Sequence, residues 1–224
     1  MTILRPALDA DPRLAAGFTT RAFAAADEPL DGVRTRLAAH EGFAAVASVG
    51  QVHGADVAVV TGGGHVEAHD GLVTAIPGVL LTVMSADCAL VLLADADAGV
   101  VGACHAGWRG TVAGVVGRTV AAMRALGAGT ISAYVGPCIS AEAFEVGDEV
   151  AAQFPAASVV RRPEWPRPHV DLSADLERQL TEAGVVTVET SRACTVAGVD
   201  RFFSYRAEDG RTGRMLGFVG LRPA

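Results

Sequence analysis

The chain has 224 residues, half of them hydrophobic, with a net charge of −7 and a pI near 5.3. This acidic balance argues against nucleic acid as a partner, because nucleic-acid binding depends on cationic contacts with phosphates. All 18 basic residues are arginine, so the sequence excludes lysine Schiff-base catalysis and the lysine of nucleotide-binding phosphate loops.

The sequence shows no apolar run long enough for a secretory signal or a membrane-spanning helix. We therefore expect a soluble protein with no membrane partner. Four cysteines, at positions 88, 104, 138 and 194, are interpreted as free thiols or ligands in a reducing compartment. The sequence thus predicts a cytoplasmic protein that binds a small molecule, and it leaves a monomer and a homodimer open.

Predicted strands dominate the first half of the chain. Short segments rich in β-branched residues predict strands at residues 44–49, 56–61, 79–84, 89–94 and 99–104. A helix is expected next, because apolar residues recur at helical spacing between Val112 and Met123, with Thr111 as its N-cap. A further strand is predicted at residues 130–135.

The carboxyl-terminal third mixes helix and strand again. Leucines recur every four residues from Leu172 to Leu180 and predict a second helix, with Ser173 near its start and Gly184 just past its end. Strands are expected at residues 185–189 and 213–219. No repeat or linker divides residues 1–224, so we predict a single domain of the α+β class, with a mixed β-sheet covered by helices.

Three residues with metal-binding side chains each stand at a predicted strand end or turn. They are His53, Cys88 and His105, at intervals of 35 and 17 residues. Zinc fingers bring their ligands in tight pairs, so these intervals are too wide for a finger. They suit a site that the fold assembles from separate segments.

Two imidazoles and one thiolate match the nitrogen and sulfur ligands that zinc prefers. Three protein ligands leave a fourth position for water, whose pKa zinc lowers to about 7. From spacing alone a second interpretation stays open, in which the histidines are hydrogen-bonded core residues and Cys88 is a buried thiol. Cys138 is interpreted either as a neighbour of the site or as a buried thiol.

The remaining histidines are expected away from this site. They are His40, His65, His69 and His169, which we interpret as surface or loop residues. Of these, His69 stands beside Asp70 and is the one expected nearest the pocket.

Several arginines are candidate anion ligands. Arg109 follows Trp108 at the start of a predicted helix, where backbone amides and the helix dipole favour phosphate. Arg21, Arg206 and Arg214 offer planar guanidinium forks that suit bidentate contact with phosphate or carboxylate. The alternative for each of them is an ion pair or a solvated surface position.

Seven short segments resemble the successive motifs of the YfiH family, also called the laccase-domain or polyphenol oxidoreductase family. They are Gln51-Val52-His53-Gly54, Asp70-Gly71-Leu72-Val73-Thr74, Ala86-Asp87-Cys88, His105-Ala106-Gly107-Trp108-Arg109-Gly110, Gly136-Pro137, Phe144-Glu145-Val146-Gly147 and Phe203-Ser204-Tyr205-Arg206. The segments keep the family's order and cover nearly the whole chain. The string that begins at His105 is the most specific of them. One departure from the family is Leu90, two residues after Cys88, where the family usually has proline.

This resemblance implies that His53, Cys88 and His105 hold one metal ion, with zinc expected and copper as the alternative. It also implies a purine nucleoside phosphorylase that acts on adenosine, inosine and methylthioadenosine, with accompanying adenosine deaminase activity. The expected partners are then a purine nucleoside and phosphate. Bacterial members were earlier described as copper-dependent polyphenol oxidases, which gives the alternative function.

In phosphorolysis, phosphate attacks the anomeric carbon of the ribose while the purine leaves. The residues predicted to act in catalysis are Asp87, Cys88, His105 and Arg109. Those predicted to bind substrate are Arg21, Gln51, Arg109, Cys138, Glu145 and Arg206. Asp87 and Glu145 are the carboxylates considered as general acid or base, and Asp87 shares a pocket with Cys88 only if the strand ends before it.

Three other functions are weighed against phosphorolysis. Phenol oxidation at several copper ions is disfavoured, because the chain has six histidines and no His-x-His pair. Hydrolysis with Cys88 as nucleophile and His105 as base would need no metal. A structural zinc domain would need a fourth protein ligand, for which Cys138 is the candidate.

Overall fold

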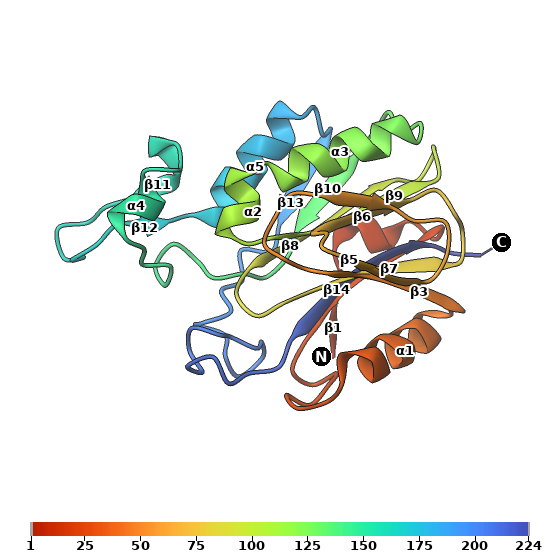
Figure 1. Cartoon of the computed structure of the whole chain (residues 1–224), viewed down its shortest axis with the longest axis horizontal. Coiled ribbons are helices and arrows are strands. Elements are labelled where there is room, and N and C mark those ends of the chain that lie inside the picture. The colour runs from red at the N-terminus through yellow and green to blue at the C-terminus, as the bar shows by residue number, and fades with distance from the viewer. Residues whose placement is uncertain (1, 224) are drawn as a thin grey trace.

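The computed structural model describes residues 2–223, and within that range two six-stranded sheets form the centre of the molecule (Figure 1). The first sheet has the order β1–β2–β14–β7–β3–β5, at Ile3–Leu4, Leu14–Thr19, Met215–Leu221, Val79–Ser85, Ala45–Gly50 and Gly64–Glu67. The second has the order β13–β10–β8–β9–β6–β4, at Thr187–Thr190, Ser132–Val135, Ala89–Asp95, Val100–Ala106, Gly71–Thr74 and Val57–Val59. Both sheets mix parallel and antiparallel neighbours.

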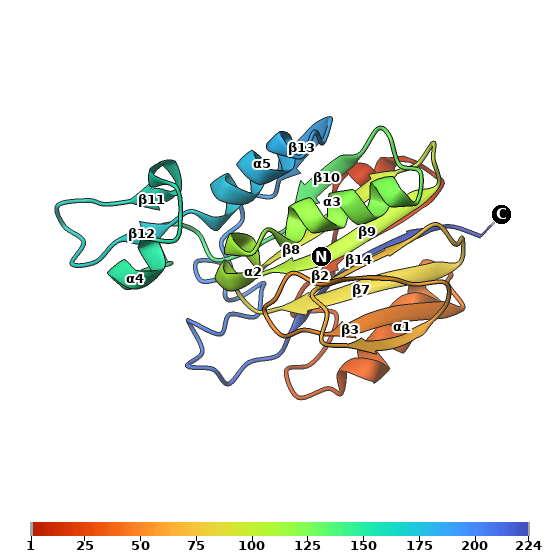
Figure 2. The ribbon, with the colours of Figure 1, turned by 45° about the horizontal axis from the view of Figure 1, so that its top comes forward.

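Helices cover the outer face of each sheet, while the inner faces pack against each other (Figures 1 and 2). Helix α1 (Leu30–Glu41) lies on the first sheet, and α3 (Val115–Ala125) and α5 (Leu172–Glu182) lie on the second. The α+β class and the mixed pairing predicted from the sequence are confirmed. No helix within residues 2–223 has the length and apolar character needed to cross a membrane.

The long central strands are buried on both faces, which explains their nearly continuous apolar sequences. All seven residues of β8 and of β9 are buried, and so are those of β14. Phe18, Leu81 and Leu92 belong to the core between the sheets. The residues that end these strands are consequently held by a rigid framework.

The predicted strands are present, although several elements escaped the sequence patterns. The structure adds β2, β5, β6 and α1 to those expected. Strand β2 reads Leu-Ala-Ala-Gly-Phe-Thr, so Thr19 is its one β-branched residue and its alanines and glycine are poor strand formers, yet every one of its residues is buried. Packing of β2 against its neighbouring strands therefore stabilises an extended conformation that its own residues favour only weakly.

The helix expected after Thr111 is two helices, so the N-cap prediction was wrong. Helix α2 (Trp108–Val112) begins after Gly107, and Thr111 lies buried inside it. The Thr111 hydroxyl donates back to the carbonyl of Gly107 at 3.0 Å, which is a bond made within a helix. Gly114, with φ of 78°, then separates α2 from α3.

A small arm protrudes from the sheets beside α2 (Figure 1). It contains α4 (Asp148–Ala151), the 3₁₀ helix η2 (Ala156–Ser158), and the paired strands β11 (Val159–Val160) and β12 (His169–Val170). His169 is buried there, with Nδ1 2.6 Å from the carbonyl oxygen of Ala141 and its ring stacked on Trp165. The interpretation of His169 as a surface or loop residue was therefore wrong.

Candidate functional site

The three predicted metal ligands meet at neighbouring strand ends. His53 follows β3, Cys88 lies in the turn between β7 and β8, and His105 lies near the end of β9. Their ligand atoms all lie within 4.8 Å of one another. In the part of the chain that the structure describes, no other group of three His, Cys or acidic side chains is gathered in this way. The pairing of strands thus brings together residues far apart in the sequence.

Asp70, a residue that the sequence analysis did not place in the site, orients the ring of His105 and holds the backbone of His53. Its carboxylate is fully buried and accepts the backbone N–H groups of Val52, His53 and Gly54 at 3.1, 3.0 and 2.6 Å. Oδ1 also lies 2.8 Å from Nδ1 of His105. A carboxylate there keeps the proton on Nδ1, so Nε2 of His105 is free to act as a ligand.

Cys88 and His105 form a charge-coupled pair. Burial raises the pKa of the Cys88 thiol, but hydrogen bonds from His105 and His53 outweigh it and lower that pKa overall. Burial lowers the pKa of His105, while hydrogen bonds to Asp70 and Cys88 raise it more. The thiolate form of Cys88 is therefore favoured, and a thiolate is the form that binds metals.

The space around the three side chains depends on Gly107. A Cβ atom at this position would stand 2.9 Å from Sγ of Cys88 and 3.1 Å from Cδ2 of His53. Real Cβ atoms essentially never come within 3.0 Å of another atom of this kind. Glycine is thus the residue that keeps the cluster open beside the first turn of α2.

His53 of the cluster and Asp87, which precedes Cys88, have strained backbones. His53 has φ of 61° and Asp87 has φ of 91°, in the left-handed region that non-glycine residues avoid at a cost of about 1–2 kcal/mol. The N–H of His53 is held by Asp70, and the carbonyl of Asp87 accepts the N–H of Ile139 at 2.8 Å. Such strain persists where the surroundings enforce it, which is typical of functional sites.

A cavity of about 480 Å³ opens beside the cluster. Its polar lining comprises Gln51, His53, Ser85, Asp87, Cys88, His105, Tyr205, Arg206 and Arg214. Its apolar lining comprises Met84, Ala86, Trp108, Ile139, Phe144 and Leu172. Volume and lining suit a small organic molecule with one flat apolar part and one charged part.

Two of the predicted site residues line this cavity but already have partners. The strand ends at Ser85, so Asp87 does share the cavity with Cys88. Its carboxylate accepts the Thr195 hydroxyl at 2.5 Å and the N–H of Arg206 at 2.7 Å. The side-chain amide of Gln51 exchanges two 2.8 Å hydrogen bonds with the backbone of Met84. Both side chains therefore brace the cavity wall.

The predicted arginines fall into different positions. Arg206 lines the cavity, and its guanidinium donates to the carbonyl oxygens of Ala143 and Glu145. Arg109 is exposed, stacks 4.3 Å from the ring of Trp108, and lies outside the lining. Arg21 pairs with Glu208 at 2.8 Å and also lies outside it.

Two further predicted contacts lie behind the wall. Cys138 is buried, with Sγ 3.2 Å from the hydroxyl of Ser173, and burial raises its pKa to about 12. Glu145 reaches the cavity wall through its carbonyl oxygen, which accepts from Arg206. Neither residue belongs to the lining. Their proposed substrate contacts stay predictions.

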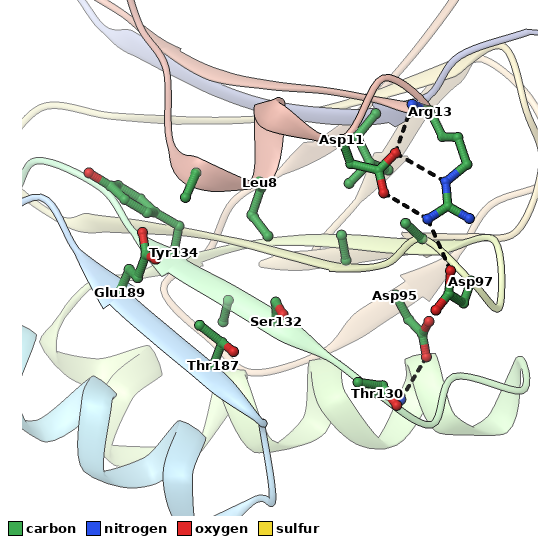
Figure 3. Close-up of a pocket in the computed structure, with 15 residues that line it drawn as sticks. Leu8, Asp11, Arg13, Asp95, Asp97, Thr130, Ser132, Tyr134, Thr187 and Glu189 are labelled. Carbon is green, nitrogen blue, oxygen red and sulfur yellow. Dashed lines mark hydrogen bonds and ion pairs between the residues drawn. The ribbon is translucent and has the colours of Figure 1, made fainter.

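A second hollow lies between the 3₁₀ helix η1 (Ala7–Ala10) and the strands β10 and β13 (Figure 3). We call it the η1 groove. Its volume is about 310 Å³. Arg13 there contacts Asp11 at 2.7 Å and Asp97 at 3.0 Å, and Asp95 accepts backbone N–H groups, including that of Thr130. In this groove the guanidinium of Arg13 is thus neutralised by two carboxylates, and the carboxylate of Asp95 is bound by backbone N–H groups.

Comparisons with known proteins give the family of this chain. A family model described as multi-copper polyphenol oxidoreductase laccase matches residues 22–222. The chain belongs to this family. A relative from Deinococcus radiodurans named purine nucleoside phosphorylase is 46% identical over 202 residues, which are 86% of this chain and 78% of the relative. Another relative of that name, from Streptomyces griseus, is 44% identical, over 84% of this chain and 80% of its own length.

Solved structures of the laccase-domain family share the fold. The crystal structure of YlmD from Geobacillus stearothermophilus is 31% identical, with a TM-score of 0.86 over 99% of both chains. The structure of a hypothetical protein YfiH from Bacillus licheniformis is 26% identical, with a TM-score of 0.86 over 94% of both chains. The resemblance found in the sequence motifs is thereby confirmed at the level of family and fold.

Proposed function

We propose that this chain is a metal-dependent purine nucleoside phosphorylase. The observation behind the proposal is the convergence of His53, Cys88 and His105 beside a cavity of nucleoside size, in a chain up to 46% identical to relatives of that name. Adenosine, inosine and methylthioadenosine are the proposed substrates, together with phosphate. Adenosine deamination is the proposed accompanying activity.

The donor set of the cluster fits a metal ion. Two imidazole nitrogens and a favoured thiolate are the ligands that zinc takes, and the space kept by Gly107 lies among them. A tetrahedral ion needs ligand atoms about 3.5 Å apart, so separations of up to 4.8 Å close with small side-chain shifts. Zinc is the proposed metal and copper the alternative. When bound, it would supply a Lewis acid that polarises an oxygen and lowers the pKa of bound water.

The protein's own side chains have separate tasks in this proposal. Asp70 holds the protonation state and orientation of His105, and so presents Nε2 toward the cavity. Trp108 and Phe144 provide flat apolar surfaces on which a purine would stack. Asp87 acts as a positioning residue, because its two oxygens tie the turn before Cys88 to Thr195 and Arg206.

His53, Cys88 and His105 all belong to the cluster and line the cavity, and direct roles in the reaction are proposed for Cys88 and His105. Arg206 is the proposed substrate contact with the best support, since its guanidinium lines the cavity. A role for Arg109 would require the exposed side chain to turn toward the cavity around Trp108. The free thiols support the further proposal that the protein acts in the cytoplasm. A monomer and a homodimer are both proposed as its oligomeric state.

The test is incubation of the purified, zinc-loaded protein with adenosine, inosine or methylthioadenosine, with and without phosphate. Free base and ribose 1-phosphate that appear only with phosphate would support phosphorolysis. Inosine formed from adenosine without phosphate would support deamination. If neither product forms while metal is bound in equal amount to protein, the proposal is wrong.

Copper-dependent phenol oxidation is the second candidate, because the matched family model is described in those terms. Multi-copper chemistry needs several metal centres, whereas within residues 2–223 one three-ligand cluster is found. The copper-loaded protein should therefore oxidise phenols slowly or not at all. Oxidation that is faster than phosphorolysis would reverse the order of the two candidates.

A further inference from the structure

Two arginines of the cavity wall have no acidic partner. Arg214 donates from Nη1 to the carbonyl oxygens of Thr212 and Gly213 at 3.0 and 2.9 Å. Arg206 likewise donates to carbonyl oxygens, at 3.1 and 3.3 Å. Among the described residues no carboxylate forms an ion pair with either guanidinium. Both arginines line the cavity, so two positive charges without a paired carboxylate belong to its wall.

This arrangement differs from that of most arginines in the chain. Arg21, Arg178 and Arg5, for example, each bind a carboxylate at 2.7–2.8 Å. Backbone carbonyls hold a guanidinium in place without cancelling its charge. A guanidinium has five N–H donors, so both arginines keep donors for a ligand.

The one carboxylate that lines the cavity does not compete for these charges. Asp87 accepts the Thr195 hydroxyl with one oxygen and the N–H of Arg206 with the other. Through that N–H, Asp87 attaches the Arg206 backbone directly to the turn that presents Cys88. The two arginines come from one segment, residues 206–214, and this bond holds that segment against the metal-ligand cluster.

We propose that Arg206 and Arg214 together bind a phosphate dianion on the cavity wall. Two guanidinium forks can contact several oxygens of one tetrahedral anion, each in the planar bidentate geometry that an ammonium group lacks. The assignment deepens the proposed function, on which its catalytic part rests, by giving phosphate a place beside the cluster. The sequence predicted Arg214 as a candidate anion ligand but did not place it among the substrate-binding residues.

In the reaction, an oxygen of the bound phosphate forms a bond to the anomeric carbon of the ribose. The bond between that carbon and the purine nitrogen breaks, and its electron pair leaves with the purine. The proton that hydrogen phosphate gives up passes through solvent to the purine. Two fixed cations favour this step by holding the nucleophile in position against the ribose.

The test measures binding of inorganic phosphate to the full-length, zinc-loaded protein by calorimetry at constant ionic strength. We expect Arg206→Gln and Arg214→Gln each to weaken phosphate binding by about tenfold or more, as the loss of a charged hydrogen bond predicts. KM for phosphate should rise equally, while KM for the nucleoside stays within about twofold. Arg214→Lys should restore binding only in part, because a point charge replaces the fork.

Arg211→Gln is the matched control, because Arg211 is an exposed arginine of the same segment that lies outside the cavity lining. This control should leave phosphate binding unchanged. Circular dichroism on every variant separates loss of binding from loss of folding. Unchanged phosphate affinity in both folded Gln variants, or equal loss in Arg211→Gln, would overturn the assignment.

Free phosphate and the phosphoryl group of a nucleotide share the chemistry that Arg206 and Arg214 would recognise. Competition between phosphate and adenosine 5′-monophosphate for binding shows which of the two the arginines bind. If the nucleotide displaces phosphate from the unmodified protein but not from Arg214→Gln, the arginine pair Arg206 and Arg214 binds a phosphoryl group carried by a substrate. The phosphate site and the proposed function can fail separately. If phosphate binding depends on both arginines but no nucleoside gives product, the phosphate site is supported and phosphorolysis is refuted. If phosphorolysis occurs and the KM for phosphate is unaltered in both variants, phosphorolysis is supported and the phosphate site is refuted.

Discussion

The cavity beside His53, Cys88 and His105 and the η1 groove are both hollows lined by charged residues, yet they differ in how those charges are used. In the η1 groove Arg13 is paired with two carboxylates. In the cavity two arginines bind only carbonyl oxygens, and three metal-binding side chains converge. A hollow becomes a binding site when its polar groups are positioned and left unneutralised, because a ligand then completes them.

The two hollows also differ in strain and in the space around their polar groups. The cavity has two non-glycine residues with positive φ beside it, and a glycine whose Cβ would collide with the cluster. In the η1 groove, three backbone N–H groups satisfy Asp95, those of Ala98, Gly129 and Thr130. Those contacts keep Asp95 occupied with its own loop. Substitutions in the two regions should therefore have very different effects.

The largest effect is expected for His105→Ala. Removal of this ligand should prevent the binding of one zinc ion per chain and lower the rate of phosphorolysis by at least about 100-fold. Losing a ligand should cost more than losing the hydrogen-bond partner of a ligand, which typically costs about 10–100-fold. Zinc content by mass spectrometry and turnover of adenosine measure this. His69→Ala, outside the cavity lining, is the control and should retain both. Full activity in folded His105→Ala would refute the site.

Gly107→Ala should disturb the cluster nearly as strongly. The added methyl would stand 2.9 Å from Sγ of Cys88, so the ligands must separate, and overpacking of this kind costs about 1–3 kcal/mol. Zinc affinity and the melting temperature should both fall. Gly117→Ala on α3, where the new methyl would meet nothing within 4 Å, should be neutral or slightly stabilising. Equal effects at the two positions would contradict the crowding argument.

Asp70→Asn should weaken zinc binding by about 10–100-fold, the usual consequence of losing the partner of a metal-binding histidine. The amide would still occupy the space, but it would no longer fix the tautomer of His105 or accept three N–H groups as an anion. Calorimetric zinc titration measures the change. Asp56→Asn, which removes an exposed carboxylate paired with Arg118, is the matched control.

A smaller effect concerns thiol reactivity in the metal-free protein. Because the pKa of Cys88 is lowered, its thiolate should be present at neutral pH and should disappear as the pH falls below that lowered pKa. Cys104 and Cys138, whose pKa burial raises to about 12, should stay protonated. Alkylation by iodoacetamide between about pH 5 and pH 9, followed by mass spectrometry, should therefore label Cys88 before Cys104 and Cys138. Preferential labelling of Cys138 would contradict this order.

The smallest effect is expected in the η1 groove. Arg13→Gln removes an exposed guanidinium whose partners are solvated carboxylates, so kcat, KM and zinc content should not change. Activity assays beside the His105→Ala experiment measure this directly. A loss of activity in Arg13→Gln would show that the groove communicates with the cavity, and would break the distinction between the two hollows.

Particular residues show where inference from the sequence succeeded. His53, Cys88 and His105 stand out because each lies at or close to the end of a strongly apolar strand, and strand ends meet when sheets form. The family motifs around them strengthened that grouping. The same motifs contain Asp70 and Gly107, so a signal for both was present, but neither residue type announces its role without a structure.

Other residues show where that inference was incomplete. Gln51 and Asp87 line the cavity as predicted, yet their polar atoms are occupied by Met84, Thr195 and Arg206. Nothing in the sequence distinguishes Arg21 from Arg206 as an anion ligand. In the structure Arg21 is paired with Glu208, whereas Arg206 on the cavity wall contacts a backbone carbonyl, because the partners of both come from segments distant in the chain.

The sequence by itself determined the class of fold and the strong central strands, because local apolar patterns decide these, and with the family motifs it predicted the grouping of His53, Cys88 and His105 that the structure shows. Tertiary structure alone decided which charged groups are neutralised. Partner choice depends on contacts between residues far apart in the chain, such as Asp70 with His105 or Asp87 with Thr195. The same packing that buries Cys138 leaves Arg214 without an acidic partner in the cavity, and that difference separates structural residues from candidate ligands.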